Sequence, residues 1–159
     1  MQHRRLTFST PAILVALALS ASCSGSDSSS PDAGDVVNCA GDPRVSAYAP
    51  NITVNSKTSG MKVSLVSSPA PPAKGNNVWT LHITNTSGAA MSGVHLGYGT
   101  LMPDHGHGSP ISSPLITDQG SGNYQVNPVD LFMPGVWHVW FYPQGATGDT
   151  ADFLFCVQG

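Results

Sequence analysis

One short segment of this 159-residue chain concentrates side chains that can bind a metal ion. In Met102-Pro103-Asp104-His105-Gly106-His107-Gly108, two imidazoles stand at alternate positions and follow a thioether and a carboxylate. Imidazole suits copper and zinc, and a thioether favours Cu(I). The glycines allow the tight backbone path that converging ligands need. The segment therefore predicts a copper site whose main ligands are His105 and His107.

A second methionine stands in a similar context further along the chain, in Met133-Pro134-Gly135. We expect Met102 and Met133 to complete the copper site, because thioethers are ligands of Cu(I). Asp104 has a different expected role, in which its carboxylate orients an imidazole from outside the set of ligands. We expect His82, His95 and His138, which lie on strands, to be surface or packing residues. Of these, His95 begins the strand that leads into the loop and is the one that could reach it.

The same residues have a simpler interpretation as an ordinary loop. Two histidines among glycines are often only solvated, and a Met-Pro pair can end a strand and fill a gap in the core. The cysteines exclude two more specialised metal centres. A blue-copper centre needs a free thiolate with further ligands downstream, and only three residues follow Cys156. A structural zinc site of several cysteines needs more thiols than the chain has.

The composition argues against catalysis and against nucleic-acid binding. The chain has no glutamate and no Gly-x-Ser-x-Gly turn, and its serines lie mostly in linkers and turns. We therefore expect no enzymatic activity. Beyond residue 22, four basic residues stand against nine aspartates, which gives a net charge of −5. Such a domain offers no basic patch to a nucleic acid.

The N-terminus has the features of an export signal. Two arginines and a histidine precede an apolar run at residues 11–19 and three small residues at 20–22. The run is too short to span a bilayer as a permanent helix. The end of this run at Cys23 resembles the lipobox of bacterial lipoproteins, in which the cysteine is lipidated. A leucine usually stands three positions before that cysteine, whereas here Leu19 stands four positions before it. We expect residues 1–22 to be a lipoprotein-type signal peptide; plain secretion is the alternative.

Residues 23–35 are expected to be the lipid-bearing cysteine and a flexible tether. The stretch is rich in Ser, Asp and Gly and has almost no apolar residues, so it cannot bury enough surface to fold. A flexible chain of this length reaches roughly 20 Å, and two or more acyl chains on Cys23 would anchor it stably. The folded domain, residues 36–159, would thus be exported and held at a membrane of the bacterial cell envelope.

The two remaining cysteines lie near opposite ends of the folded region. If Cys23 carries lipid, two of the three cysteines remain and can pair with each other. Disulfides persist in exported proteins. This predicts a Cys39–Cys156 disulfide, with two free buried thiols as the alternative. A bridge across so long a loop contributes at most about 5 kcal/mol in the chain-entropy account.

Short strands joined by turns dominate the folded region. The whole chain has 17 glycines, 13 prolines and only 9% charged residues, a composition that favours strands and turns over helices. Alternating or apolar runs predict strands at 45–54 (interrupted by Pro50), 61–65, 79–83, 93–100, 123–129, 137–141 and 152–157. About seven strands without a convincing helix predict an all-β, immunoglobulin-like β-sandwich, with a closed barrel as the alternative.

The alternation also assigns side chains to the two faces of each strand. The side chains expected in the core are Trp79, Leu81, Ile83, Trp137, Val139 and Phe141. Those expected on the outer faces are His82, His138 and Trp140.

The region from about Met61 to Val157 resembles the YtkA-like domain family of exported bacterial proteins, which is related to the FixH type. The resemblance rests on the strand at 78–84, the MP-x-HGHG stretch at 102–108 and the MPG-x-W stretch at 133–137. It implies an immunoglobulin-like sandwich, exported or tethered to a membrane, with a link to copper handling. The position before the tryptophan is often basic in such sequences and is Val136 here.

Two functions follow from these observations. In the first, the protein is a non-enzymatic, lipid-anchored envelope module that binds or passes on copper. In the second, it is a metal-free sandwich whose loop and Trp140 contact another envelope protein, or a passive surface lipoprotein. The histidines of the loop distinguish the two, because only the first function needs them as ligands.

Overall fold

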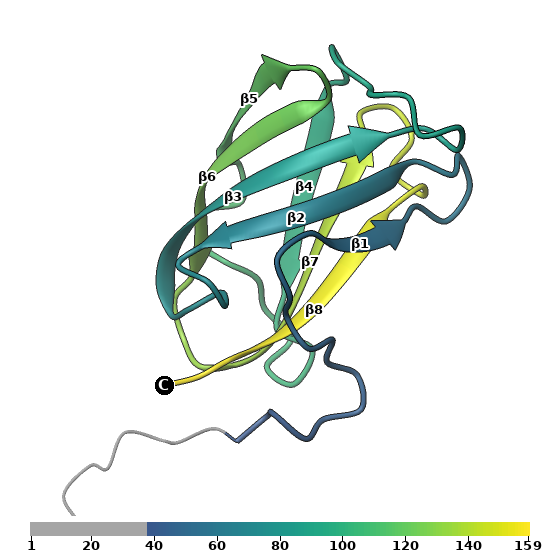
Figure 1. Ribbon diagram of the computed structural model, residues 1–159. Helices are drawn as coiled ribbons and strands as arrows, with labels where there is room; N and C mark the ends of the chain where they lie inside the picture. Colours follow the sequence, from purple (N-terminus) through teal and green to yellow (C-terminus); the bar gives the residue numbers. More distant parts are fainter. Residues whose placement is uncertain (1–37) are drawn as a thin grey trace, which may run out of the picture. The chain divides into compact units, whose positions relative to one another are not determined.

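The computed structural model describes residues 38–159, which form two packed antiparallel sheets (Figure 1). The predicted signal peptide, the lipid-bearing Cys23 and the tether lie outside the described residues. In chain order the strands are β1 (Ile52–Asn55), β2 (Lys62–Ser68), β3 (Gly75–Thr84), β4 (Leu96–Leu101), β5 (Leu115–Gly120), β6 (Asn123–Leu131), β7 (Gly135–Pro143) and β8 (Ala151–Val157). Between residues 38 and 159 there is no helix that could cross a membrane.

The strands are divided five to three between the sheets. One sheet has the order β1-β2-β3-β6-β5 and the other the order β4-β7-β8. On one side of the sandwich β1 contacts β8, and on the other side β4 and β5 are the edge strands. The all-β sandwich predicted from the sequence is confirmed, with eight strands in place of about seven.

Aromatic side chains from both sheets fill the core. All six side chains expected inside are fully buried, while His82 is exposed and His138 and Trp140 are partly buried on the outer face. The Trp79 ring lies between 5.9 and 6.5 Å from three phenylalanine rings of the opposite sheet, measured between centroids. Such edge-to-face and tilted contacts join the sheets through large apolar surfaces.

Two strand predictions were wrong. β5 was not predicted, because Leu115–Gly120 contains only two apolar residues and pairs with a single neighbour at the sheet edge. The first strand is also shorter than expected. It begins at Ile52, since Pro50 lacks the N–H that a strand ladder needs.

The chain between residues 38 and 50, here called the N-terminal segment, is fastened to β8 without forming a strand. The predicted Cys39–Cys156 disulfide is present, with 5.4 Å between the Cα atoms. The amide of Ser46 donates to the carbonyl of Leu154 (2.9 Å). The ring of Tyr48 packs edge-on against Phe155, with 5.9 Å between centroids. These contacts hold the segment against the three-stranded sheet.

Candidate metal site

The histidine loop (residues 102–108) follows β4 and folds back on itself at one end of the sandwich. The amide of Met102 donates to the carbonyl of His107 (2.7 Å), and the carbonyl of Met102 accepts from the amides of His105 (3.1 Å) and Gly106 (2.8 Å). Gly106 has a φ of 71°, in the left-handed region that suits glycine. The backbone thus closes a tight turn on which the two histidines are neighbours.

His105 and His107 lie side by side at the protein surface. Their ring centroids are 5.6 Å apart, and both side chains are exposed. Nδ1 of His107 lies 3.3 Å from the carbonyl oxygen of Gly108. Because a carbonyl only accepts, this contact fits the tautomer with the proton on Nδ1, in which Nε2 is the nitrogen that binds a metal. An ion bonded at about 2 Å to one nitrogen of each ring allows a centroid separation of up to roughly 6 Å, so the two rings can share one ion.

Met102 lies beneath the loop in the core. Its side chain is fully buried. A Cβ atom added to Gly135 would come within 2.7 Å of the Met102 methyl group, so the two strands meet closely there. In this structure the thioether acts as a core residue that fills space. The expectation that Met102 helps to form a surface site has no support from its position.

Met133 lies on the chain segment next to the histidines. Its side chain is partly buried against the core, and its carbonyl accepts from Nε1 of Trp137 (2.9 Å). The neighbouring Phe132 is 38% exposed, and its ring centroid lies 5.6 Å from that of His107. Of the two predicted thioethers, Met133 is therefore the one on the surface segment that contacts the histidine pair.

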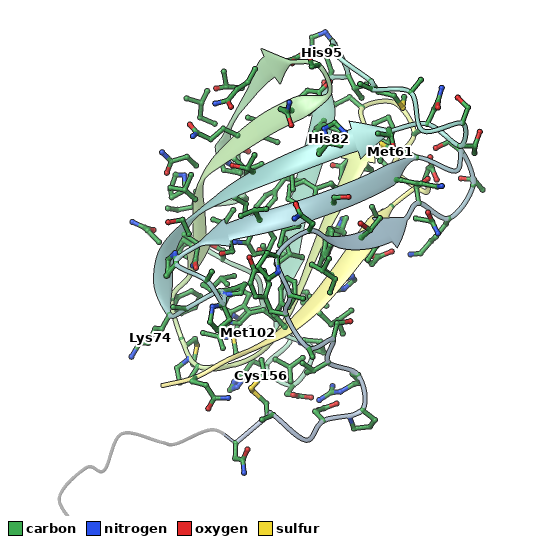
Figure 2. The ribbon with its side chains drawn as sticks, in the orientation of Figure 1. Met61, Lys74, His82, His95, Met102 and Cys156 are labelled. Atoms are coloured by element: carbon green, nitrogen blue, oxygen red, sulfur yellow. A yellow bond between two sulfur atoms is a disulfide. The ribbon has the colours of Figure 1, made fainter. Side chains whose placement is uncertain are left out.

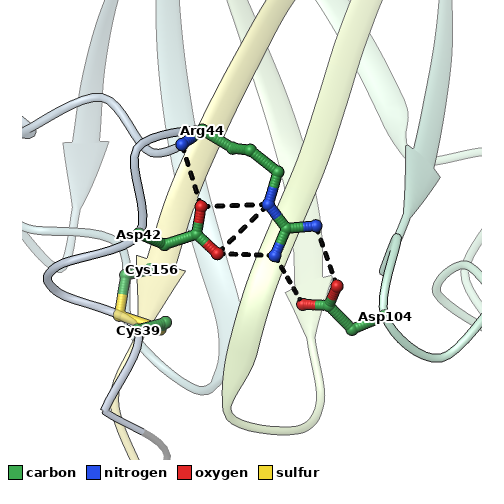
Figure 3. Close-up of polar contacts among 5 residues, drawn as sticks. All are labelled: Cys39, Asp42, Arg44, Asp104 and Cys156. Carbon is green, nitrogen blue, oxygen red and sulfur yellow. Dashed lines mark hydrogen bonds and ion pairs between the residues drawn. A yellow bond between two sulfur atoms is a disulfide. The ribbon is translucent and has the colours of Figure 1, made fainter.

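Asp104 does not orient an imidazole, contrary to expectation, because its carboxylate is held by Arg44 (Figure 3). Two parallel hydrogen bonds join them, from Nη1 to Oδ1 (2.8 Å) and from Nη2 to Oδ2 (2.9 Å). The same guanidinium also binds Asp42, with 2.9 Å from Nε to Oδ1. The hydrogen bonds from Arg44 lower the pKa of Asp42 to about 2 and hold the pKa of Asp104 below its usual range. Arg44 thus connects the N-terminal segment to the histidine loop.

This role of Arg44 was not predictable from the sequence. The only signal was its rarity, as one of four basic residues beyond the predicted signal peptide. Its partners are 2 and 60 residues away along the chain. Only the fold brings the distant pair together.

His95, the strand histidine that could have reached the loop, is exposed and lies away from it. It precedes β4, whereas the histidine loop follows it, and Figure 2 shows His95 and Met102 at opposite ends of the sandwich. A six-residue strand is about 20 Å long. In the part of the chain that the structure describes, no group of three His, Cys, Asp or Glu side chains could hold a metal. The histidine loop therefore offers two nitrogen ligands, and further ligands would be a thioether, a carbonyl or water.

A comparison with known protein families identifies the family of this chain. The sequence model of the YtkA-like family matches residues 55–140, which is more than half of the chain. This chain belongs to the YtkA-like family. The matched region begins at the end of β1 and includes both the histidine loop and Met133. The YtkA-like match does not include Arg44 or either cysteine of the disulfide. No curated protein and no solved structure matches the chain significantly.

Proposed function

We propose that this YtkA-like protein is a non-enzymatic, lipid-anchored module of the bacterial cell envelope that binds copper through His105 and His107. One observation carries the proposal. The two imidazoles are exposed on one closed turn, with 5.6 Å between their centroids. The contact of His107 Nδ1 with a carbonyl fits the tautomer in which Nε2 binds the metal.

The types of ligand favour copper over zinc. Protein zinc sites use three or four side chains, mostly His, Cys and carboxylates, and residues 38–159 contain no such group of three. Copper accepts imidazole together with a thioether, the combination that the loop and Met133 offer. An exposed site with few protein ligands also suits the capture and release of an ion, since a partner can reach the metal directly.

The location in the envelope rests on the N-terminal sequence and on the disulfide. Cys23 stands where a lipoprotein cysteine would stand, directly after small residues and an apolar run. The Cys39–Cys156 bridge is typical of proteins that fold in an oxidising compartment. A Cys23→Ser variant should move the protein from the membrane fraction to the soluble fraction of the envelope. Membrane retention of that variant would refute the lipid anchor without affecting the metal proposal.

A copper titration of the full chain, purified in mild detergent, tests the metal proposal. We expect one tight equivalent of Cu(II), or of Cu(I) in the presence of ascorbate, and its loss in the His105→Ala/His107→Ala variant. The matched control is His82→Ala/His95→Ala, which removes two imidazoles that lie away from the loop. Equal binding by the wild type and the loop variant would refute the copper site. That result would favour the metal-free module, in which the loop contacts another envelope protein.

A further inference from the structure

A groove of about 650 Å³ lies on the side of the sandwich where β4 and β5 are edge strands. Its walls come from the start of β4 and the residues before it, from the approach to β5 and its first residues, and from the end of β7. Its volume is in the range of protein sites for small molecules, about 300–1,000 Å³. His95 is one of its lining residues, so the groove is at the end of β4 opposite the histidine loop (Figure 2).

The lining of the groove combines aromatic rings with neutral polar groups. Tyr98 and Tyr142 contribute rings, and four further side chains can donate or accept hydrogen bonds: His95, Gln144, Ser112 and Ser113. The lining contains no lysine or arginine. Its one carboxylate, Asp118, already accepts hydrogen bonds from the backbone amides of Gly93 and Gly120. An anionic ligand would therefore find no cationic side chain in this lining.

Tyr142 presents a ring face beside this groove. It pairs across the strands with Gly97, and a Cβ atom added to that glycine would come within 2.2 Å of the tyrosine ring. The ring therefore lies over the glycine backbone, an arrangement that protects an edge strand. Tyr142 is one of the lining residues of the groove, so a ligand there would meet this ring and its hydroxyl.

We propose that this groove binds a neutral carbohydrate. A pyranose ring has an apolar face of C–H groups, which can stack on Tyr142, and a rim of hydroxyls, which can bond to His95 and Gln144. A purely apolar ligand would leave the polar groups of the groove without partners, at a cost in free energy.

Calorimetric titration of the full chain with three soluble sugars tests the proposal: tetra-N-acetylchitotetraose, cellotetraose and maltotetraose. We expect at least one of them to bind at micromolar to millimolar concentration. Tyr142→Ala should weaken binding by about tenfold, because an aromatic contact accounts for roughly that factor. Tyr142→Phe should retain most of the affinity, since it keeps the ring.

Two further variants separate a binding defect from a folding defect. Gln144→Ala should weaken binding while leaving the Tyr142 ring in place over Gly97. His82→Ala, on the outer face of the other sheet, should bind as the wild type does. The His105→Ala/His107→Ala variant should also bind sugar normally, because the histidine loop is at the other end of β4. The proposal would be overturned by the absence of binding to all three sugars at millimolar concentration, or by equal binding of the wild type, Tyr142→Ala and Gln144→Ala. Binding of an extended peptide instead of a sugar would also overturn it.

Discussion

Removal of the Cys39–Cys156 disulfide should strongly destabilise the domain. The bond joins positions 117 residues apart, so it restricts almost the whole folded chain in the unfolded state. In the chain-entropy account, a closed loop of this length contributes about 5 kcal/mol, and residual structure in the unfolded state lowers the figure. We expect the Cys39→Ala/Cys156→Ala variant to lose about 3–5 kcal/mol of unfolding free energy. That is a large part of the 5–15 kcal/mol typical of a domain.

The full effect requires the N-terminal segment to unfold together with the sandwich. Three observations support this cooperation: Cys39 is only 6% exposed, Tyr48 packs on Phe155, and Ser46 bonds to β8. If the N-terminal segment detached before the sandwich unfolded, the folded sandwich would depend less on the disulfide. Removing the disulfide would then lower the unfolding free energy much less.

Urea unfolding followed by tryptophan fluorescence measures this free energy. The variant should unfold at a much lower urea concentration, and wild type treated with a thiol reductant should show the same shift. Hydrogen exchange at the amide of Ser46 should proceed at the rate of global unfolding in the wild type. A loss below about 1 kcal/mol, or fast exchange at Ser46, would refute the cooperative docking of the segment.

Three further changes test other parts of the structure. Arg44→Met should raise the pKa of Asp104 toward its usual value, because the hydrogen bonds that lower it are lost; a carboxyl NMR titration that shows no change would contradict the ion pair. Gly108→Ala should destabilise the domain by about 1–3 kcal/mol in thermal unfolding, because the added Cβ would come within 2.4 Å of a backbone oxygen of β4. Gly148→Ala is the control in the same experiment, since Gly148 has open space around it. Burial alone would raise the pKa of Asp149, but hydrogen bonds from the turn between β1 and β2 outweigh it and hold the pKa well below its usual range. The Asp149 carboxylate therefore stabilises the fold above the unfolded-state pKa of about 3.9. Urea unfolding should show stability falling as the pH drops below that value, and Asp149→Asn should make this fall smaller.

The parts of the fold that the sequence predicted are those where one face of a strand is buried. The segments at 79–83 and 137–141 alternate strictly, because their inward side chains fill the core and their outward ones meet solvent. β5 lacks this signal. Most of its residues are exposed, and backbone pairing with β6 defines it as a strand. Backbone hydrogen bonds impose no pattern on side chains, so a strand of this kind gives little evidence in the sequence.

The candidate site was predictable in its residue types but not in its geometry. The sequence indicated that imidazoles and thioethers were close along the chain, and the fold confirms that the two histidines are neighbours. Met102 was predicted as a ligand but lies in the core. The alternation of inward and outward side chains along β4 continues beyond residue 100, where the predicted strand ended. Leu96 and Tyr98 point into the core, and Met102 has the same parity and does so too. A longer predicted strand would have identified it as a core residue.

The position of the histidine loop depends on residues that the family match does not include. Arg44 binds Asp104 within the loop, and the disulfide fixes the segment that carries Arg44 to β8. The loop is thereby held from two sides, by the end of β4 and by the N-terminal segment. A loop that is already ordered loses less conformational entropy when it binds an ion. If the proposed ion binds at the histidine pair, the contact between Arg44 and Asp104 would therefore favour binding by ordering the loop beforehand.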